Sequence, residues 1–409
     1  MIPRYGPTYT WAELREAAGL ARASDPFAHL RHRLSEFYGV RHVFLFNGAS
    51  VALYALLRGY ARPGGVVMPA YTCIEVPEAV GYAGYRSVLA DIDYETLNMT
   101  AEGIERAITA DTTVILVTHQ FGIPPDMDEI GEVCARYGTL VVEDAAAAFG
   151  ATFGGRLVGT FGRAAILSFH RTKVVSADLG GALITNDDQL AQRVEDLCRS
   201  ELLPSAFWKP FLRSAAWKAV MSPALYAGVR LAYRLAYGEQ MVQLVRARAS
   251  CPARFFRDCS PLSAALLSVQ LDRLAGQVDQ RRRLAEVYRT QLEGTCVRVP
   301  TVPAGAAPAW IQMPVRVRDK GKFYHHMLAS GVDLSWNFRY SCAESYGQLG
   351  CTEARRAAET VLGLPTYPTL SDAQLAAVCR GLRSFVSHHG RDSWQSQSER
   401  RVGDCVDSR

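Results

Sequence analysis

Between residues 43 and 144, short apolar runs alternate with segments whose apolar residues recur at helical spacing. The strand-like runs cover residues 43–46, 66–68, 87–90, 114–117 and 139–144, and the helix-like segments cover 50–60, 76–83, 101–108 and 128–137. This alternation predicts repeated strand–helix–strand units, and therefore an α/β fold with a mostly parallel sheet and helices on both faces. In sheets of this kind, ligands bind beyond the carboxyl ends of the strands.

The length of the chain leaves room for a second, smaller domain. With 409 residues, 49% of them hydrophobic, the chain can build one large core and a satellite unit. We expect a large domain over residues 1–260, an interdomain helix with a small α+β domain over 261–389, and a disordered polar tail over 390–409. Residues 10–38 are predicted to be helical with Thr10 as a candidate cap, and residues 262–293 to form one long amphipathic helix.

Composition argues against several classes of protein. The formal net charge of +5 is too small to indicate a nucleic-acid partner. The ten cysteines show neither CxxC nor Cys/His ligand spacing, which argues against a zinc site and against a disulfide framework. The N-terminus does not have the pattern of a signal peptide, and no apolar run reaches the roughly 18 residues of a membrane span. We therefore expect a cytoplasmic protein.

An acid and a lysine follow two of the strand-like runs. Asp144 closes the run 139–144, and Lys173 lies five residues after Ser168, which belongs to the run 164–170. A lysine can bond covalently with the aldehyde of pyridoxal 5′-phosphate (PLP), and an acid can keep the pyridine nitrogen protonated so that the ring accepts electrons. Alone, the lysine would be a surface residue and the acid a helix cap. Together, and with residues 168–173 reading Ser-Phe-His-x-x-Lys, they predict a PLP site.

A turn of small residues offers a place for the phosphate of such a cofactor. Gly48, Ala49 and Ser50 lead from the strand at 43–46 into the helix at 50–60, where backbone N–H groups and the helix N-terminus favour an anion. A strand-to-helix turn needs small residues in any case, so this signal is weak by itself. Ser168 would add a hydroxyl to the same phosphate, and its ordinary alternative is a hydrogen-bonded core serine.

Two further stretches face the same end of the predicted sheet. Tyr71 and Cys73 share a face if residues 69–73 are extended, and an aromatic ring there could stack on the pyridine ring. Core packing is an equally good role for Tyr71. His119 and Gln120 follow the strand at 114–117, where hydrogen bonding to the backbone is the more common role for polar residues.

From about residue 28 to residue 386, the chain resembles the fold-type-I PLP enzymes of the DegT/DnrJ/StrS sugar-aminotransferase type. The resemblance rests on the motifs at residues 47–50, 69–72, 91–98, 119–128, 142–146, 168–173, 180–181, 270–271 and 364–368. It implies a large PLP domain, a small C-terminal domain and a homodimer with active sites at the subunit interface. It also implies transfer of an amino group, usually from glutamate, to a nucleotide-linked keto-sugar or a related cyclic ketone.

The resemblance also assigns roles by matching positions. Lys173 would bind the cofactor and shuttle protons, and Asp144 would hold the pyridine nitrogen. A dehydratase branch of the family has histidine in place of the lysine, so Lys173 argues against that branch. The remaining cofactor-binding residues would be Gly48, Ala49, Ser50, Ser168, Tyr71, Cys73 and Ala146.

Four departures from the family pattern favour a divergent branch. Ala147 stands where a glutamine or histidine often reaches the phenolic oxygen of the cofactor, and Cys73 stands where the ring-stacking aromatic is usual. The acid that commonly precedes Gly-Gly is replaced by Leu179, with Asp178 adjacent. The asparagine that usually reaches the phosphate in the partner subunit aligns near Phe256. These differences leave open a PLP lyase or bond-forming enzyme acting on a non-sugar substrate.

Residues 204–250 interrupt the α/β pattern. They contain seven basic residues, one acidic residue and seven aromatic residues. We expect a packed helical insert that covers the active site or the dimer interface. The alternative is a basic and aromatic surface that makes peripheral contact with a membrane.

Overall fold

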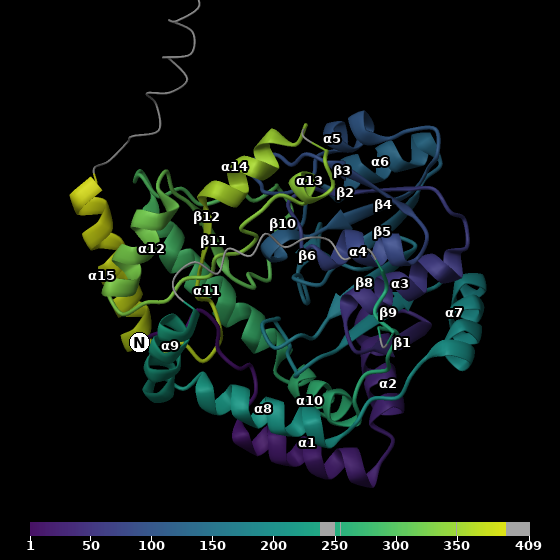
Figure 1. Ribbon diagram of the computed structural model, residues 1–409, viewed down its shortest axis with the longest axis horizontal. Coiled ribbons are helices and arrows are strands. Elements are labelled where there is room, and N and C mark those ends of the chain that lie inside the picture. The colour runs from purple at the N-terminus through teal and green to yellow at the C-terminus, as the bar shows by residue number, and fades with distance from the viewer. Residues whose placement is uncertain (238–249, 254, 349, 390–409) are drawn as a thin grey trace, which may run out of the picture.

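A seven-stranded sheet lies at the centre of the molecule, in the order β1-β9-β8-β5-β4-β2-β3 (Figure 1). The computed structural model describes residues 1–237, 250–253, 255–348 and 350–389. The strands are β1 (His42–Phe46), β2 (Gly65–Pro69), β3 (Arg86–Ala90), β4 (Thr112–Thr118), β5 (Leu140–Asp144), β8 (Ala164–Ser168) and β9 (Gly181–Thr185). Strand β9 runs antiparallel to β1 and β8, and the other neighbouring pairs are parallel. The predicted mostly parallel α/β sheet is confirmed.

Helices cover both faces of this sheet because its strands alternate apolar residues between the faces. Leu45 of β1 belongs to one apolar cluster and Phe46, the next residue, belongs to the other. The first cluster includes α2 (Pro26–Tyr38) and α10 (Pro261–Leu271), and the second includes α3 (Ala49–Tyr60) and α7 (Asp188–Glu201). Along the chain, β2 to β5 are connected by α4 (Glu75–Tyr82), α5 (Ala101–Ala107), the 3₁₀ turn η1 (Gln120–Gly122) and α6 (Met127–Tyr137).

The helical structure predicted over residues 10–38 is confirmed, and it consists of two helices. Helix α1 (Trp11–Ala23) begins at Thr10, whose side chain accepts from the Glu13 backbone N–H in a capping box, as expected of the cap. It ends at Ser24. Helix α2 then begins at Pro26, with the Asp25 carboxylate accepting from two backbone N–H groups of its first turn. Proline lacks the N–H that would continue the first helix, so Asp-Pro starts a new one.

The predicted single helix over residues 262–293 is also divided. Helix α10 ends at Leu271, and α11 (Leu274–Leu292) follows after a break at Asp272 and Arg273. Neither residue is a proline or glycine, so local sequence does not signal the break. The side chains of Gln270, Arg273 and Gln277 around it bind the buried N-terminal segment at Thr8.

The remaining elements form smaller layers beside the main sheet. Strand β11 (Met313–Arg316) pairs antiparallel with β12 (Val361–Leu364), and a short sheet joins β10 (Ala306–Ala307), β6 (Thr152–Phe153) and β7 (Arg156–Leu157). The C-terminal helices are α12 (Lys320–Ala329), α13 (Cys342–Ser345), α14 (Thr352–Thr360) and α15 (Asp372–His389). In Figure 1 they lie to one side of the seven-stranded sheet. The tail predicted over residues 390–409 lies outside the described residues.

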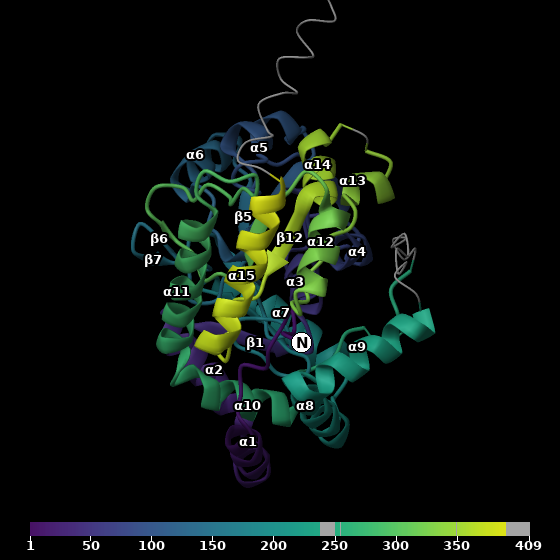
Figure 2. The same cartoon turned by 90° about the vertical axis from the view of Figure 1, so that its left-hand side faces the viewer.

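Two helices occupy the described part of the 204–250 insert. Helix α8 (Trp208–Val220) packs against α1 and α10, and α9 (Pro223–Tyr237) extends away from the body (Figure 2). Tyr226 and Arg230 attach α9 to the buried carboxylate of Asp333. Residues 238–249 lie outside the described part of the chain. Among the described helices, none is both long and apolar enough to cross a membrane.

Candidate active site

A cavity of about 630 Å³ opens at the carboxyl ends of the parallel strands. Because β5 and β8 are parallel neighbours, with Asp144 paired to Ile166, the ends of these two strands meet at this edge of the sheet. Asp144 ends β5, and Lys173 follows β8 after a turn in which its backbone N–H donates to the His170 carbonyl at 2.8 Å. Both Asp144 and Lys173 line the cavity. Its size is that of a small-molecule site.

Burial pushes the two charged groups toward their neutral forms. It lowers the pKa of the Lys173 amine, and the negative charge of Asp144 opposes this shift most strongly. It raises the pKa of the Asp144 carboxyl, although the Ala146 backbone N–H donates to its Oδ1 at 3.1 Å. A buried acid with this single N–H donor among its described partners is suited to a cationic ring nitrogen, which would restore its ionised form.

The turn after β1 presents backbone N–H groups to the same cavity. Gly48 is the N-cap of α3. Because glycine has no side chain to accept hydrogen bonds from the first backbone N–H groups of the helix, those N–H groups can bind a ligand. Gly48, Ala49, Ser50 and Ser168 all line the cavity. This arrangement suits a phosphate, because the helix N-terminus and its N–H donors favour negative charge.

Gly181 lets the turn approach the sheet closely. In the ladder it lies opposite Phe46 of β1 and Ser168 of β8. A Cβ atom at this position would lie 2.3 Å from the carbonyl carbon of Gly48, so a side chain would displace the turn. The Gly-Gly motif at 180–181 therefore has a structural cause at the predicted phosphate site.

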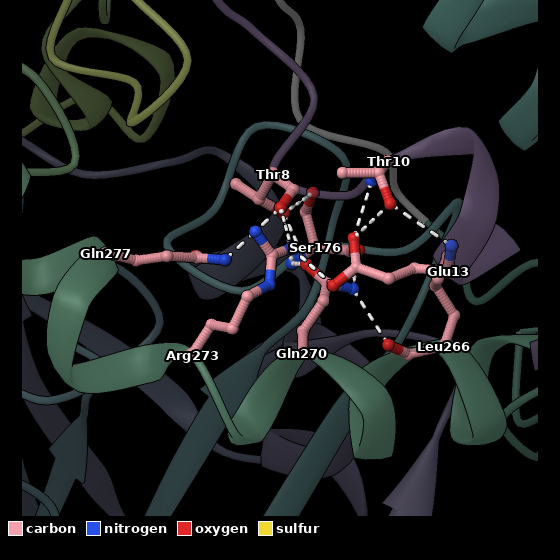
Figure 3. Close-up of polar contacts among 8 residues, drawn as sticks. All are labelled: Thr8, Thr10, Glu13, Ser176, Leu266, Gln270, Arg273 and Gln277. Carbon is pink, nitrogen blue, oxygen red and sulfur yellow. Dashed lines mark hydrogen bonds and ion pairs between the residues drawn. The ribbon is translucent and has the colours of Figure 1, made fainter.

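The turn that carries Lys173 is held by a buried polar network (Figure 3). The Gln270 amide donates to the Ser176 carbonyl at 2.8 Å and accepts from the Thr8 hydroxyl at 2.5 Å. Thr8 and Ser176 also share a hydrogen bond of 2.7 Å between their hydroxyls. The Thr8 carbonyl accepts from Arg273 and Gln277, each at 3.2 Å. The N-terminal segment at Thr8 and the end of α10 at Gln270 are thus both bound to Ser176, three residues after Lys173.

A second set of contacts holds the turn from the other side. Asp178, 2% exposed, forms ion pairs with Arg171 at 3.1 Å and with Arg213 of α8 at 2.5 Å. Burial nonetheless raises the pKa of the Asp178 carboxyl, with both arginines opposing the shift. The guanidinium of Arg171 also lies over the ring of Trp217, 5.3 Å from its centroid. Helix α8 of the insert is therefore attached to the segment between Lys173 and Gly181.

The structure separates the other sequence candidates. Cys73 and Ala146 line the cavity together with the residues above. Tyr71 does not line it: the ring is fully buried and packs edge-on against Phe338, with centroids 5.2 Å apart. His119 is buried at Glu143, with 3.1 Å between Nε2 and Oε2, and is likewise not part of the lining.

Several residues that sequence reasoning missed also face the cavity. Gln312, Asn337 and Phe338 come from the C-terminal part of the chain, and Tyr5 comes from the N-terminal segment. Asn337 Nδ2 donates to the side-chain oxygen Oε1 of Gln312, and Asn337 Oδ1 accepts from the Ser335 hydroxyl at 2.7 Å. No local motif marks these residues, because they meet only through tertiary packing.

His170 was visible in the Ser-Phe-His-x-x-Lys motif, and burial lowers its pKa to about 4.

The residues present fit PLP. Lys173 offers an amine for the aldehyde, Asp144 a carboxylate for the ring nitrogen, and the turn at 48–50 with Ser168 a set of donors for the phosphate. The three groups line one cavity from the carboxyl ends of β1, β5 and β8. No cluster of His, Cys, Asp or Glu suited to a metal ion occurs within the described part of the chain.

Known proteins share both the sequence and the fold. The model of the DegT/DnrJ/EryC1/StrS aminotransferase family matches residues 19–219 and 257–383. The chain is 28% identical over 360 residues to UDP-N-acetyl-3-dehydro-α-D-glucosamine 3-aminotransferase of Acidithiobacillus ferrooxidans, with 86% of each chain covered. It is 26% identical over 356 residues to dTDP-4-dehydro-2,3,6-trideoxy-D-glucose 4-aminotransferase of Saccharopolyspora spinosa, with 85% of each covered. A crystal structure of an aminotransferase from Streptoalloteichus hindustanus matches with a TM-score of 0.77 and 25% identity, covering 95% of this chain and all of that one.

Fold and site together define a PLP-dependent aminotransferase of fold type I. The match over most of its length places the chain in the DegT/DnrJ/EryC1/StrS aminotransferase family. The resemblance found in the sequence is confirmed. Amino-group transfer is also supported over the lyase that the departures at Ala147 and Cys73 left open.

Proposed function

We propose that this enzyme transfers an amino group from glutamate to the ketone carbon of a keto-sugar or a related cyclic ketone. The observation that carries the proposal is the pair of Lys173, half-buried, and Asp144, buried, at adjacent strand ends of one cavity. The keto-sugar class is supported by two relatives, of which the chain covers 86% and 85%, and whose names give a UDP-linked and a dTDP-linked dehydro-sugar as substrates.

The roles of the side chains follow from burial and charge. When bound, PLP supplies an aldehyde that receives the amino group and a ring that withdraws electrons from the carbon bearing it. Asp144 holds the ring nitrogen in its cationic form. Lys173 Nζ takes the proton from the α-carbon of the donor, and in the second half-reaction delivers a proton to the carbon of the acceptor that becomes the amine carbon. Because burial lowers its pKa, the neutral amine that acts as a base is available at lower pH than that of an exposed lysine.

Covalent trapping tests the proposal. Borohydride reduction of the PLP-loaded protein, followed by peptide mapping, is expected to place the cofactor on Lys173. Lys173→Ala is expected to lose trapped cofactor, and glutamate is expected to convert the wild-type chromophore to the pyridoxamine form. Return of the original absorbance with a candidate keto-sugar would identify the acceptor. The proposal would be refuted if the cofactor were trapped on another residue, or if no amino donor changed the absorbance of the bound cofactor.

We further propose a homodimer with shared active sites. The described lining residues include one lysine and no arginine, so a dianionic phosphate gains little cationic compensation within one subunit. Positive charge from a partner subunit would complete the site. Light scattering on the purified protein is expected to give twice the 44.9 kDa of one chain, and a monomer with full cofactor affinity would contradict the proposal.

Two other predictions belong to the same proposal. We assign cofactor binding to a large domain over residues 1–260, and the wall formed by Gln312 and Asn337 to the small domain over 261–389. We also propose a cytoplasmic enzyme, supported by the free thiols of the nine described cysteines. Cell fractionation would test the location, and limited proteolysis would test the domain boundary.

A further inference from the structure

One donor in the cavity has no assigned role. Gln120 lines the cavity and is 4% exposed, and its Nε2 has no hydrogen-bond partner among the described residues. Its backbone is fixed, because its N–H donates to Asn98 Oδ1 at 2.9 Å and its carbonyl accepts from the Ile123 N–H at 2.9 Å. A buried, unpaired amide N–H is costly, so its persistence at a ligand cavity indicates that a ligand atom satisfies it.

The order of the strands limits which atom this can be. In the proposed site, the ring nitrogen lies at Asp144 on β5 and the aldehyde carbon at Lys173. The phosphate lies on the side of β8, β9 and β1, where the turn at 48–50 and Ser168 are found. In PLP the phosphate arm and the phenolic oxygen sit on opposite sides of the line from ring nitrogen to aldehyde. The phenolic oxygen therefore falls on the other side of β5, which is the side of β4.

Gln120 lies just beyond the end of β4. Ala147, which follows β5 and also lines the cavity, has no polar side chain to offer this oxygen. The hydroxyl of Thr118, the last residue of β4, is a second unpaired group at the same edge. Gln120 is the better candidate, because an amide N–H can only donate and the phenolic oxygen accepts when it is ionised.

We propose that Gln120 donates a hydrogen bond from Nε2 to the phenolic oxygen of the cofactor and so replaces the contact that Ala147 cannot make. The inference rests on the proposed function, because it concerns the cofactor held by Lys173 and Asp144. A donor at the ionised oxygen stabilises its negative charge and competes with the internal hydrogen bond of the bound cofactor. It should therefore lower the pH at which the bound cofactor loses its proton.

A pH titration of the visible absorbance of the PLP-loaded protein tests this inference. Gln120→Leu keeps the approximate size of the side chain and removes the amide, and is expected to move the titration midpoint up by about one pH unit. Adding Ala147→Gln in the same chain is expected to return it toward the wild-type value. The matched control is Gln192→Leu on the exposed surface of α7, which should titrate like the wild type.

Two results would overturn the inference. One is a Gln120→Leu protein that titrates like the wild type, and the other is an upward shift of the titration midpoint in Thr118→Val but not in Gln120→Leu. Circular dichroism of each variant shows whether it has folded, and Gln120→Met, which also lacks the amide, keeps the test valid if Gln120→Leu folds poorly. Failure of the proposed function would look different, because borohydride would then fail to label Lys173 in the wild type itself.

Discussion

At the scale of single residues, the site depends on burying charge where a ligand will neutralise it. Asp144 and Asp178 are buried and Lys173 is half-buried, and burial is the largest cause of the pKa shift of each. For Asp178 the compensation is built into the protein as two arginines. For Asp144 the described compensation is one backbone N–H and the nearby lysine, which leaves room for a cationic ligand.

The lowered pKa of Lys173 predicts how cofactor incorporation depends on pH. Only the neutral amine attacks an aldehyde, so the rate of PLP incorporation into cofactor-free protein should rise with pH, with a midpoint below the ordinary 10.5. Glu75 lines the cavity and raises the pKa of Lys173, so Glu75→Gln should move the midpoint to lower pH. Stopped-flow absorbance measures the rate. Glu16→Gln, at an exposed position of α1, is the control, and a midpoint that does not move in Glu75→Gln would contradict the electrostatic account.

At the scale of elements, local signals identified most helices and strands of the main sheet but not every boundary. The Asp25-Pro26 pair that divides residues 10–38 is a strong local signal that periodicity alone overlooked. The break at Asp272 and Arg273 could not be predicted locally, because its neighbours bind Thr8 from more than 260 residues away. Likewise, Tyr71 has the alternation of a cavity residue, yet it packs against Phe338 from the C-terminal part of the chain.

Helix α8 lets the role of the insert be tested. Its Arg213, half exposed, is one of two cationic partners of buried Asp178, so Arg213→Ala should destabilise the cofactor-free protein by about 1–2 kcal/mol, less than the full loss of a buried pair. Hydrogen exchange over residues 170–181 should increase, because this segment carries Lys173. Denaturant unfolding and exchange mass spectrometry give the two readouts.

The control for that experiment lies on the same helix. Lys209 is exposed, so Lys209→Ala is expected to leave stability and exchange unchanged within about 0.5 kcal/mol. Equal behaviour of the two variants would show that α8 does not support the lysine turn. Peripheral membrane contact through residues 204–250 stays a separate prediction, which salt-dependent liposome sedimentation would check.

At the scale of the whole molecule, the cavity has walls from three parts of the chain. The sheet edge supplies the predicted cofactor groups, the N-terminal segment supplies Tyr5, and the C-terminal part supplies Gln312 and Asn337. Tyr5 and Ser335 share a hydrogen bond of 2.6 Å between their hydroxyls, which joins the N-terminal segment to the C-terminal part. The sequence identified the sheet edge because its residues follow strands. The other walls depend on long-range contacts that leave no local pattern.

This shared cavity predicts that the cofactor stabilises the chain as one cooperative unit. At a free concentration 100 times Kd, a ligand that binds the folded state adds about 2.7 kcal/mol to the free energy of unfolding. PLP should therefore raise Tm in a single transition, and inorganic phosphate alone should raise it much less. Hydrogen exchange should slow not only at 47–50 and 168–173 but also at 335–338, because Asn337 lines the cavity and is bonded to Gln312. Protection confined to the sheet edge, or two separate thermal transitions of which PLP shifts one, would show that the C-terminal wall is not coupled to the cofactor site.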